Sequence, residues 1–201
     1  MRARHVLLIL CVLLPAAAGA AEPIARVVRQ DGVAFVVRDI ARPQALAVGT
    51  DLFVDDEIRT GADGRVVVES EAGLKLVIGA ASEVRIRRWL VDQPQSRIEV
   101  VLSMVTGILR LLGEPVDRPR TVEVQTRAAV ASVRSTEWVI EATGAGTAVL
   151  SIEGTVTVRS PMGGGTLQPG DGMDVRLAAP PNPPARWGQA RVDSTLARVP
   201  F

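Results

Sequence analysis

Short runs of β-branched residues, separated by glycine or proline, fill most of this chain and constrain its fold more than any other feature. From about residue 24 to residue 177 the runs are four to seven residues long and recur roughly every ten residues. This pattern is typical of short strands joined by turns. It predicts an all-β fold: a single β-rich domain over residues 22–177, solenoid-like or sandwich-like, with many short strands and little or no helix.

The strands are expected to be of two kinds. Residues 84–87 and 122–125 alternate apolar and polar side chains, which predicts one face on the core and one in water. Residues 66–68 and 100–102 are apolar at successive positions, which predicts strands covered on both faces. Separate strands are also expected at 97–104 and 108–112, and the glycines at 163–165 are interpreted as a flexible hairpin connection.

Residues 1–21 have the order of a secretory signal peptide. Arg2 and Arg4 precede an apolar run over residues 6–14, and small residues follow up to Ala21. The run is too short to span a membrane, and the bulky residues before Cys11 argue against a lipid anchor. We therefore expect a mature chain that begins near Ala21 or Glu22, in the periplasm or outside the cell.

Residues 178–201 differ in composition from the rest of the chain. They open with four prolines within five positions, at 180, 181, 183 and 184, and proline cannot donate a hydrogen bond to a sheet. The segment is predicted to be a Pro-rich tail, extended or disordered. A docking segment or an envelope spacer is the alternative interpretation.

Several kinds of chemistry are excluded by composition. His5 and Cys11 are the only histidine and cysteine, both lie in the predicted leader, and the chain has no tyrosine. A mature domain without them has no disulfide, no thiol nucleophile, no His-based triad and no zinc site of His or Cys ligands. We expect no catalytic residue, no cofactor and no metal; the acidic residues at 55–57 are interpreted as a solvated turn rather than a calcium site.

Charge excludes one class of partner. The chain has 23 basic and 22 acidic side chains and shows no basic run. Nucleic-acid binding depends on neutralising phosphates, so no nucleic-acid partner is expected. No later segment is long and apolar enough to be membrane-spanning.

Seven motifs, in order, resemble the FecR-type extracytoplasmic domain over about residues 46–177. They are Arg59-Thr60-Gly61, Ser82-Glu83-Val84-Arg85-Ile86, Gly107-Ile108-Leu109, Val124-Gln125-Thr126 with residues 129–133, Arg134-Ser135-Thr136-Glu137-Trp138, residues 149–156, and residues 167–175 with Gly170. The chain departs from the family pattern at Glu71-Ala72-Gly73, where the family has Asp-Gly, at Arg127 for proline, at Ser135 for glycine and at Trp138 for phenylalanine.

The resemblance implies an extracytoplasmic β-rich module that works through contacts and carries no catalytic group. Iron-signalling members would add a cytoplasmic segment for a sigma factor, a membrane helix and a receptor-contacting region. This sequence shows a predicted leader and a short Pro-rich segment instead, so control of a sigma factor is not part of the prediction.

Arg134, Glu137 and Trp138 are the candidate binding residues, because they set two charges and an indole between apolar strands. A core position for Trp138 is the competing interpretation. The predicted function is a non-enzymatic binding or scaffold module of the bacterial envelope, with an envelope protein or a glycan as partner and a role in envelope sensing. The alternatives are a self-associating structural protein that forms homo-oligomers and a glycan hydrolase that uses two carboxylates.

Overall fold

The fold is built almost entirely from short strands, as the sequence predicts. A computed structural model describes residues 22–38, 42–92, 97–114, 120–133 and 137–201, which form seventeen strands and one helix. The predicted leader and Arg134 lie outside the described residues. Hydrogen-bonded pairings connect the strands into one open sheet. The all-β class is therefore confirmed.

The sheet is folded into two layers that share the long strand β9 (Arg97–Gly113). Layer A runs in the order β4 (Asp51–Leu52), β1 (Ala25–Asp31), β6 (Arg65–Ser70), β7 (Leu74–Ile78), the second part of β9, β12 (Glu137–Ala142), β13 (Gly146–Ser151), β16 (Asp171–Arg176) and β17 (Ala185–Arg186). Layer B runs in the order β3 (Gln44–Ala45), β2 (Ala34–Val37), β5 (Glu57–Thr60), β8 (Glu83–Asp92), the first part of β9, β10 (Arg120–Gln125), β11 (Val130–Val133), β14 (Val156–Ser160) and β15 (Gly163–Leu167).

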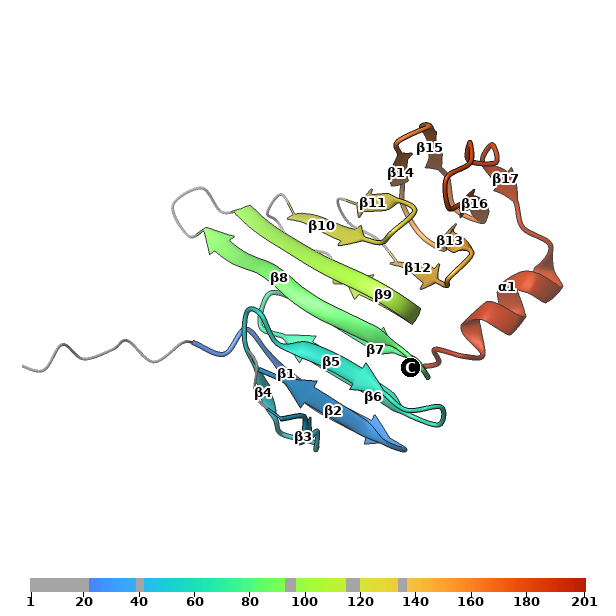
Figure 1. Ribbon diagram of the computed structural model, residues 1–201. Helices are drawn as coiled ribbons and strands as arrows, with labels where there is room; N and C mark the ends of the chain where they lie inside the picture. Colours follow the sequence, from blue (N-terminus) through green and yellow to red (C-terminus); the bar gives the residue numbers. More distant parts are fainter. Residues whose placement is uncertain (1–21, 39–41, 93–96, 115–119, 134–136) are drawn as a thin grey trace, which may run out of the picture.

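Strand β9 lies between the N-terminal and C-terminal halves of the molecule (Figure 1). Up to Thr106 it pairs with β8 in layer B, and from Gly107 it pairs with β12 in layer A. Gly107 has a φ of 105°, a conformation that favours glycine. The separate strands expected at 97–104 and 108–112 are therefore one strand, which changes layer at this glycine.

The main core lies between the two layers. It contains alternate residues of both layers, such as Val66 and Val68 of β6 and Val100 and Leu102 of β9. Val67, between the first two, is also buried, so β6 is covered on both faces as predicted. Val101 is only half-buried, so the first part of β9 is covered on one face, and the prediction of two covered faces is wrong for residues 100–102.

The segment after residue 177 is where the fold differs from the sequence prediction. The expected tail contains β17 and the helix α1 (Gln189–Leu196), and Val199 is fully buried. Val192 and Leu196 lie one turn apart on one face of α1, and Val199 follows three residues after the helix ends; together they give the segment an apolar side that can pack on the sheet. The prediction of an extended or disordered tail is therefore wrong for residues 185–200.

A second difference concerns the glycines at 163–165. They form most of strand β15 rather than a flexible connection, and β15 pairs with β14. A Cβ on Gly165 would lie 2.5 Å from Cγ of Pro184. The missing side chain thus lets the Pro-rich segment that precedes β17 pass close to this strand.

Candidate functional site

Two of the three candidate binding residues lie on opposite faces of β12. Trp138 points into the main core and is fully buried, although it was one of the residues proposed to contact a partner. Glu137 points outward, and its carboxylate accepts a hydrogen bond from Nε of Arg110 at 2.7 Å. Glu137 and Trp138 therefore do not form one surface, and Arg134 lies outside the described residues.

Three of the family-like motifs meet at one buried point where β9 changes layer. The hydroxyl of Thr60 donates to the carbonyl of Gly79 at 2.6 Å and accepts from the backbone N–H of Ser82 at 2.9 Å. The Ser82 hydroxyl in turn accepts from the N–H of Ile108 at 3.1 Å, and a Cβ on Gly107 would overlap Ser82. These motif residues hold the two layers together. Within the described part of the chain, none of them offers an exposed group that could bind a partner or react.

The acidic residues at 55–57 also have a structural role. Asp56 is 2% exposed, accepts from Nε of Arg38 at 3.0 Å and from the N–H of Phe53 at 3.0 Å. It closes the loop before β5, so the interpretation of this cluster as a solvated turn is wrong for Asp56. Within the described ranges, no group of three or more His, Cys, Asp or Glu side chains could hold a metal ion.

The outer face of layer A carries a row of cross-strand neighbours that sequence reasoning missed. The row runs over Val67, Val77, Arg110, Val139, Leu150 and Gly172, each directly opposite the next. Because four of the six are aliphatic, this face needs a cover. The cover is the segment over residues 185–201, which we call the C-terminal strap (Figure 1).

The strap contacts the row at its Gly172 end and along its middle. The indole of Trp187 lies against Gly172, where a Cβ would overlap the ring. Val192, Leu196 and Val199 join the same apolar cluster as Val139 and Leu150. In the middle of the row the guanidinium of Arg110 donates to the carbonyl of Val199 at 3.1 Å and lies 3.7 Å from the centre of the Phe201 ring.

Two ion pairs fasten the strap at its margins. Both nitrogens of the Arg191 fork donate to Asp174 of β16, at 2.9 and 2.6 Å. Those of Arg198 donate to Glu141 of β12, at 2.6 and 2.7 Å. The hydrogen bond from Glu141 raises the pKa of Arg198. Such bidentate pairs set the relative orientation of the two side chains in addition to pairing their charges, so the strap packs on the sheet in one register.

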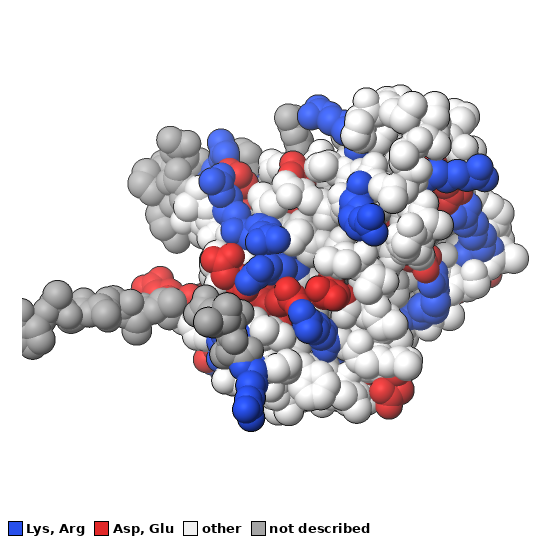
Figure 2. All heavy atoms as spheres, viewed as in Figure 1, with Lys and Arg blue, Asp and Glu red and all other residues white. Residues whose placement is uncertain are grey.

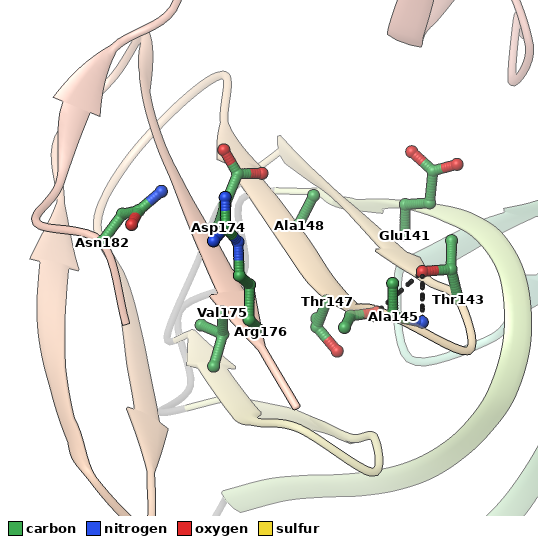
Figure 3. A pocket seen from close by; sticks show the side chains of 10 residues that line it. Glu141, Thr143, Ala145, Thr147, Ala148, Asp174, Val175, Arg176 and Asn182 are labelled. Atoms are coloured by element: carbon green, nitrogen blue, oxygen red, sulfur yellow. Dashed lines mark hydrogen bonds between the residues drawn. The ribbon is translucent and has the colours of Figure 1, made fainter. Parts of the chain in front are cut away.

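A shallow pocket of about 320 Å³ opens beside the strap. The ends of β12, β13 and β16 line it, together with Asn182 of the segment before β17. Figure 3 shows that Glu141 and Asp174, the two carboxylates that hold the strap, stand in this pocket with Thr143 and Arg176.

The spacing of Val192, Leu196 and Val199 is the sequence signal that could have identified the strap.

Comparison with known proteins agrees with the motif resemblance. The family model described as FecR protein matches residues 56–157, which is half of the chain and runs from the start of β5 into β14. The chain belongs to the FecR family. The strap, β16 with Gly172 and Asp174, and the strands before β5 lie outside the matched part of this FecR chain.

Solved structures show the same fold. Two crystal structures of a "putative anti-sigma factor" from Parabacteroides distasonis match with TM-scores of 0.55 and 0.56, each at 18% identity over 70% of this FecR chain. The chain spans 64% and 63% of the length of those two. No curated protein matches it. Among the described residues, no helix has the length and apolar character needed to cross a membrane.

Proposed function

We propose that this FecR protein is a non-enzymatic module of the bacterial envelope that binds another protein and takes part in envelope sensing or regulation. The observation that carries the proposal is the family match over residues 56–157. The fold shared with the two crystal structures described as a "putative anti-sigma factor" supports a regulatory setting and a protein partner. Self-association is the competing possibility that the partner experiment below separates; a scaffold role and a glycan partner are further alternatives.

The surface of the molecule supports contact with a protein rather than with a polyanion. On the face seen in Figure 2, acidic and basic side chains are interspersed. Pairs such as Arg59 with Glu57 and Arg88 with Glu99 balance their charges locally, at 2.5 and 2.8 Å. Interspersed charges favour orientation and specificity between proteins, whereas a polyanion favours a field of one sign.

Export is part of the proposal and rests on the order of charges and apolar residues in residues 1–21. Cell fractionation tests it. We expect the chain in the periplasm or the medium, with a mature N-terminus near Ala21 or Glu22. A full-length chain in the cytoplasm would contradict export.

The partner is tested in the cell and then with purified proteins. A tagged chain is expressed in its own organism, cross-linked in the intact envelope, and purified; each captured protein is then made separately and mixed with the purified chain in a binding titration. We expect saturable one-to-one binding by a monomeric chain. Concentration-dependent assembly in light scattering, with no protein that binds in the titration, would overturn the proposal in favour of the structural alternative.

A further inference from the structure

Glu141 and Asp174 each have two roles in the structure. Each carboxylate binds an arginine of the C-terminal strap through two hydrogen bonds, and each also lines the pocket beside the strap (Figure 3). Their side chains are 29% and 37% exposed. A cationic group from outside can therefore reach the carboxylates that hold the strap in place.

The strap is weakly held for a segment that covers an apolar face. Its helix has eight residues, no side-chain hydrogen bond at its N-cap and no acidic residue in its first turn. Isolated helices of fewer than about 12 residues are marginal in water, so tertiary contacts alone keep it folded. Its two ion pairs lie at the surface, where each pair changes an equilibrium constant only a few-fold, or about tenfold for the two together. The strap is therefore expected to open at a lower free energy than global unfolding.

When the strap opens, it exposes the outer face of layer A, on which the side chains form a defined pattern. The aliphatic part of the row consists of Val67, Val77, Val139 and Leu150 across four strands of layer A. At one end Gly172 leaves room for an aromatic ring, as its contact with Trp187 shows. The carboxylates of Glu141 and Asp174 stand at the margin. The best ligand for this face is a short amphipathic segment with an aromatic residue and arginines at the spacing of the strap.

We propose that the outer face of layer A is the partner-docking surface of this protein, and that the strap occupies it in the unbound state. The partner offers a basic, amphipathic segment whose arginine enters the pocket, binds Glu141 or Asp174, and displaces the strap from the row. The inference rests on the proposed function in that the partner is a protein. It adds the surface, the chemistry of the partner segment and an inhibitory role for residues 185–201.

The strap sequence itself is the probe. A fluorescent peptide with the sequence of residues 185–201 is titrated with the full chain, and binding is followed by anisotropy. The chain with Arg191→Gln and Arg198→Gln has a weakened strap but an intact surface, so it should bind the peptide about tenfold more tightly than the unaltered chain. The chain with Glu141→Gln and Asp174→Asn also has a weakened strap, but it lacks the negative charges that pair with arginine and should show no gain.

Controls separate docking from non-specific binding. A chain with Arg85→Gln, an arginine of layer B whose Nε donates to the carbonyl of Asp55, should bind the peptide as the unaltered chain does. A peptide that carries glutamine in place of Arg191 and Arg198 should lose most of its affinity. Equal binding by the two peptides would overturn the role of the carboxylates.

Opening of the strap is measured directly by thiol labelling, in chains in which Cys11 is replaced by serine. Val139→Cys places a thiol under the strap and Val149→Cys places one in the main core; the two valines are 1% and 0% exposed. The two Arg→Gln changes should speed labelling at position 139 about tenfold and leave position 149 unchanged.

Two outcomes of the labelling experiment also overturn the proposal. One is unchanged labelling at position 139, which would mean that the ion pairs do not hold the strap. The other is faster labelling without tighter peptide binding, which would mean that the uncovered face is not a docking surface. Both readouts use only the chain and a peptide, so their failure is distinct from a failure to find a partner in the cell.

Discussion

Thr60 and Ser82 lie 22 positions apart in sequence, and the backbone N–H of Ser82 donates a hydrogen bond to the hydroxyl of Thr60 at 2.9 Å. The same hydroxyl donates to the carbonyl of Gly79, and the side chain of Ser82 accepts from the N–H of Ile108. Through these bonds β5, β8 and β9 meet at a buried polar point. The motifs that identify the family thus form the point at which β9 passes from layer B to layer A.

Removing either hydroxyl should therefore destabilise the fold. Thr60→Val and Ser82→Ala each leave buried backbone groups without a partner, at a cost of about 1–3 kcal/mol in the free energy of unfolding. Urea denaturation measures the change. Thr121→Val is the control, because Thr121 is exposed on β10, and it should stay within about 0.5 kcal/mol. A loss no larger than the control would contradict the role of this cluster.

Trp138 should behave as a core residue and not as a binding residue. Trp138→Ala removes a fully buried indole, so it should lower the free energy of unfolding by about 3–5 kcal/mol. Trp138→Phe should cost less, since it keeps most of the apolar volume. Thermal unfolding followed by circular dichroism measures both changes, and an alanine variant as stable as the parent would refute the core assignment.

Arg120 is a buried guanidinium held by main-chain carbonyls. It is 2% exposed, and it donates to Glu114 at 2.7 Å and to Gly73 at 3.0 Å; burial lowers its pKa. Arg120→Met should cost about 2 kcal/mol or more, because those carbonyls lose their donors. Gly113→Ala should destabilise by a different route, since its Cβ would overlap the guanidinium. Chemical denaturation of both variants checks this, with exposed Arg87→Gln as the control.

Gly172→Ala should loosen the strap while leaving the layers intact. The added Cβ would overlap the indole of Trp187. Hydrogen exchange followed by mass spectrometry should show faster exchange in residues 185–201 and unchanged exchange in β7 and β13. Gly144→Ala is the matched control, because nothing lies within 4 Å of its added Cβ. Similar exchange in the two variants would count against the close contact of Trp187 with the sheet.

The lowered pKa values of two carboxylates predict how the stability of the fold depends on pH. The hydrogen bond from Arg65 lowers the pKa of Asp31, and those from Arg97 and Arg88 lower the pKa of Glu99. A lowered pKa in the folded state contributes stability above the unfolded pKa, about 4, and that stability is lost as the pH falls through the folded value. Glu99→Gln should flatten the decline in stability below pH about 4, as measured by urea midpoints from pH 3 to 6. An equally steep decline would contradict it.

Local sequence patterns were sufficient for the class of fold and for the faces of residues 66–68, 84–87 and 122–125, but not for those of residues 100–102. Alternation in residues 122–125 correctly placed Val122 and Val124 in the core, because side chains of a strand point to opposite faces at a period of two. The run at residues 66–68 correctly indicated a strand covered on both sides. The order of short motifs also identified the family.

Tertiary structure decided what covers the outer face of layer A and which residues can meet a partner. The Pro-rich composition after residue 177 favours an extended chain, yet packing on Val139 and Leu150 gives an eight-residue helix a stability it lacks alone. Sequence also placed Glu137 and Trp138 together, although neighbours in a strand face opposite ways. Arg198 and Glu141 are 57 positions apart, so their pairing exists only when the sheet has formed. Local patterns show which side of a strand is apolar, whereas contacts between distant residues determine what lies against it.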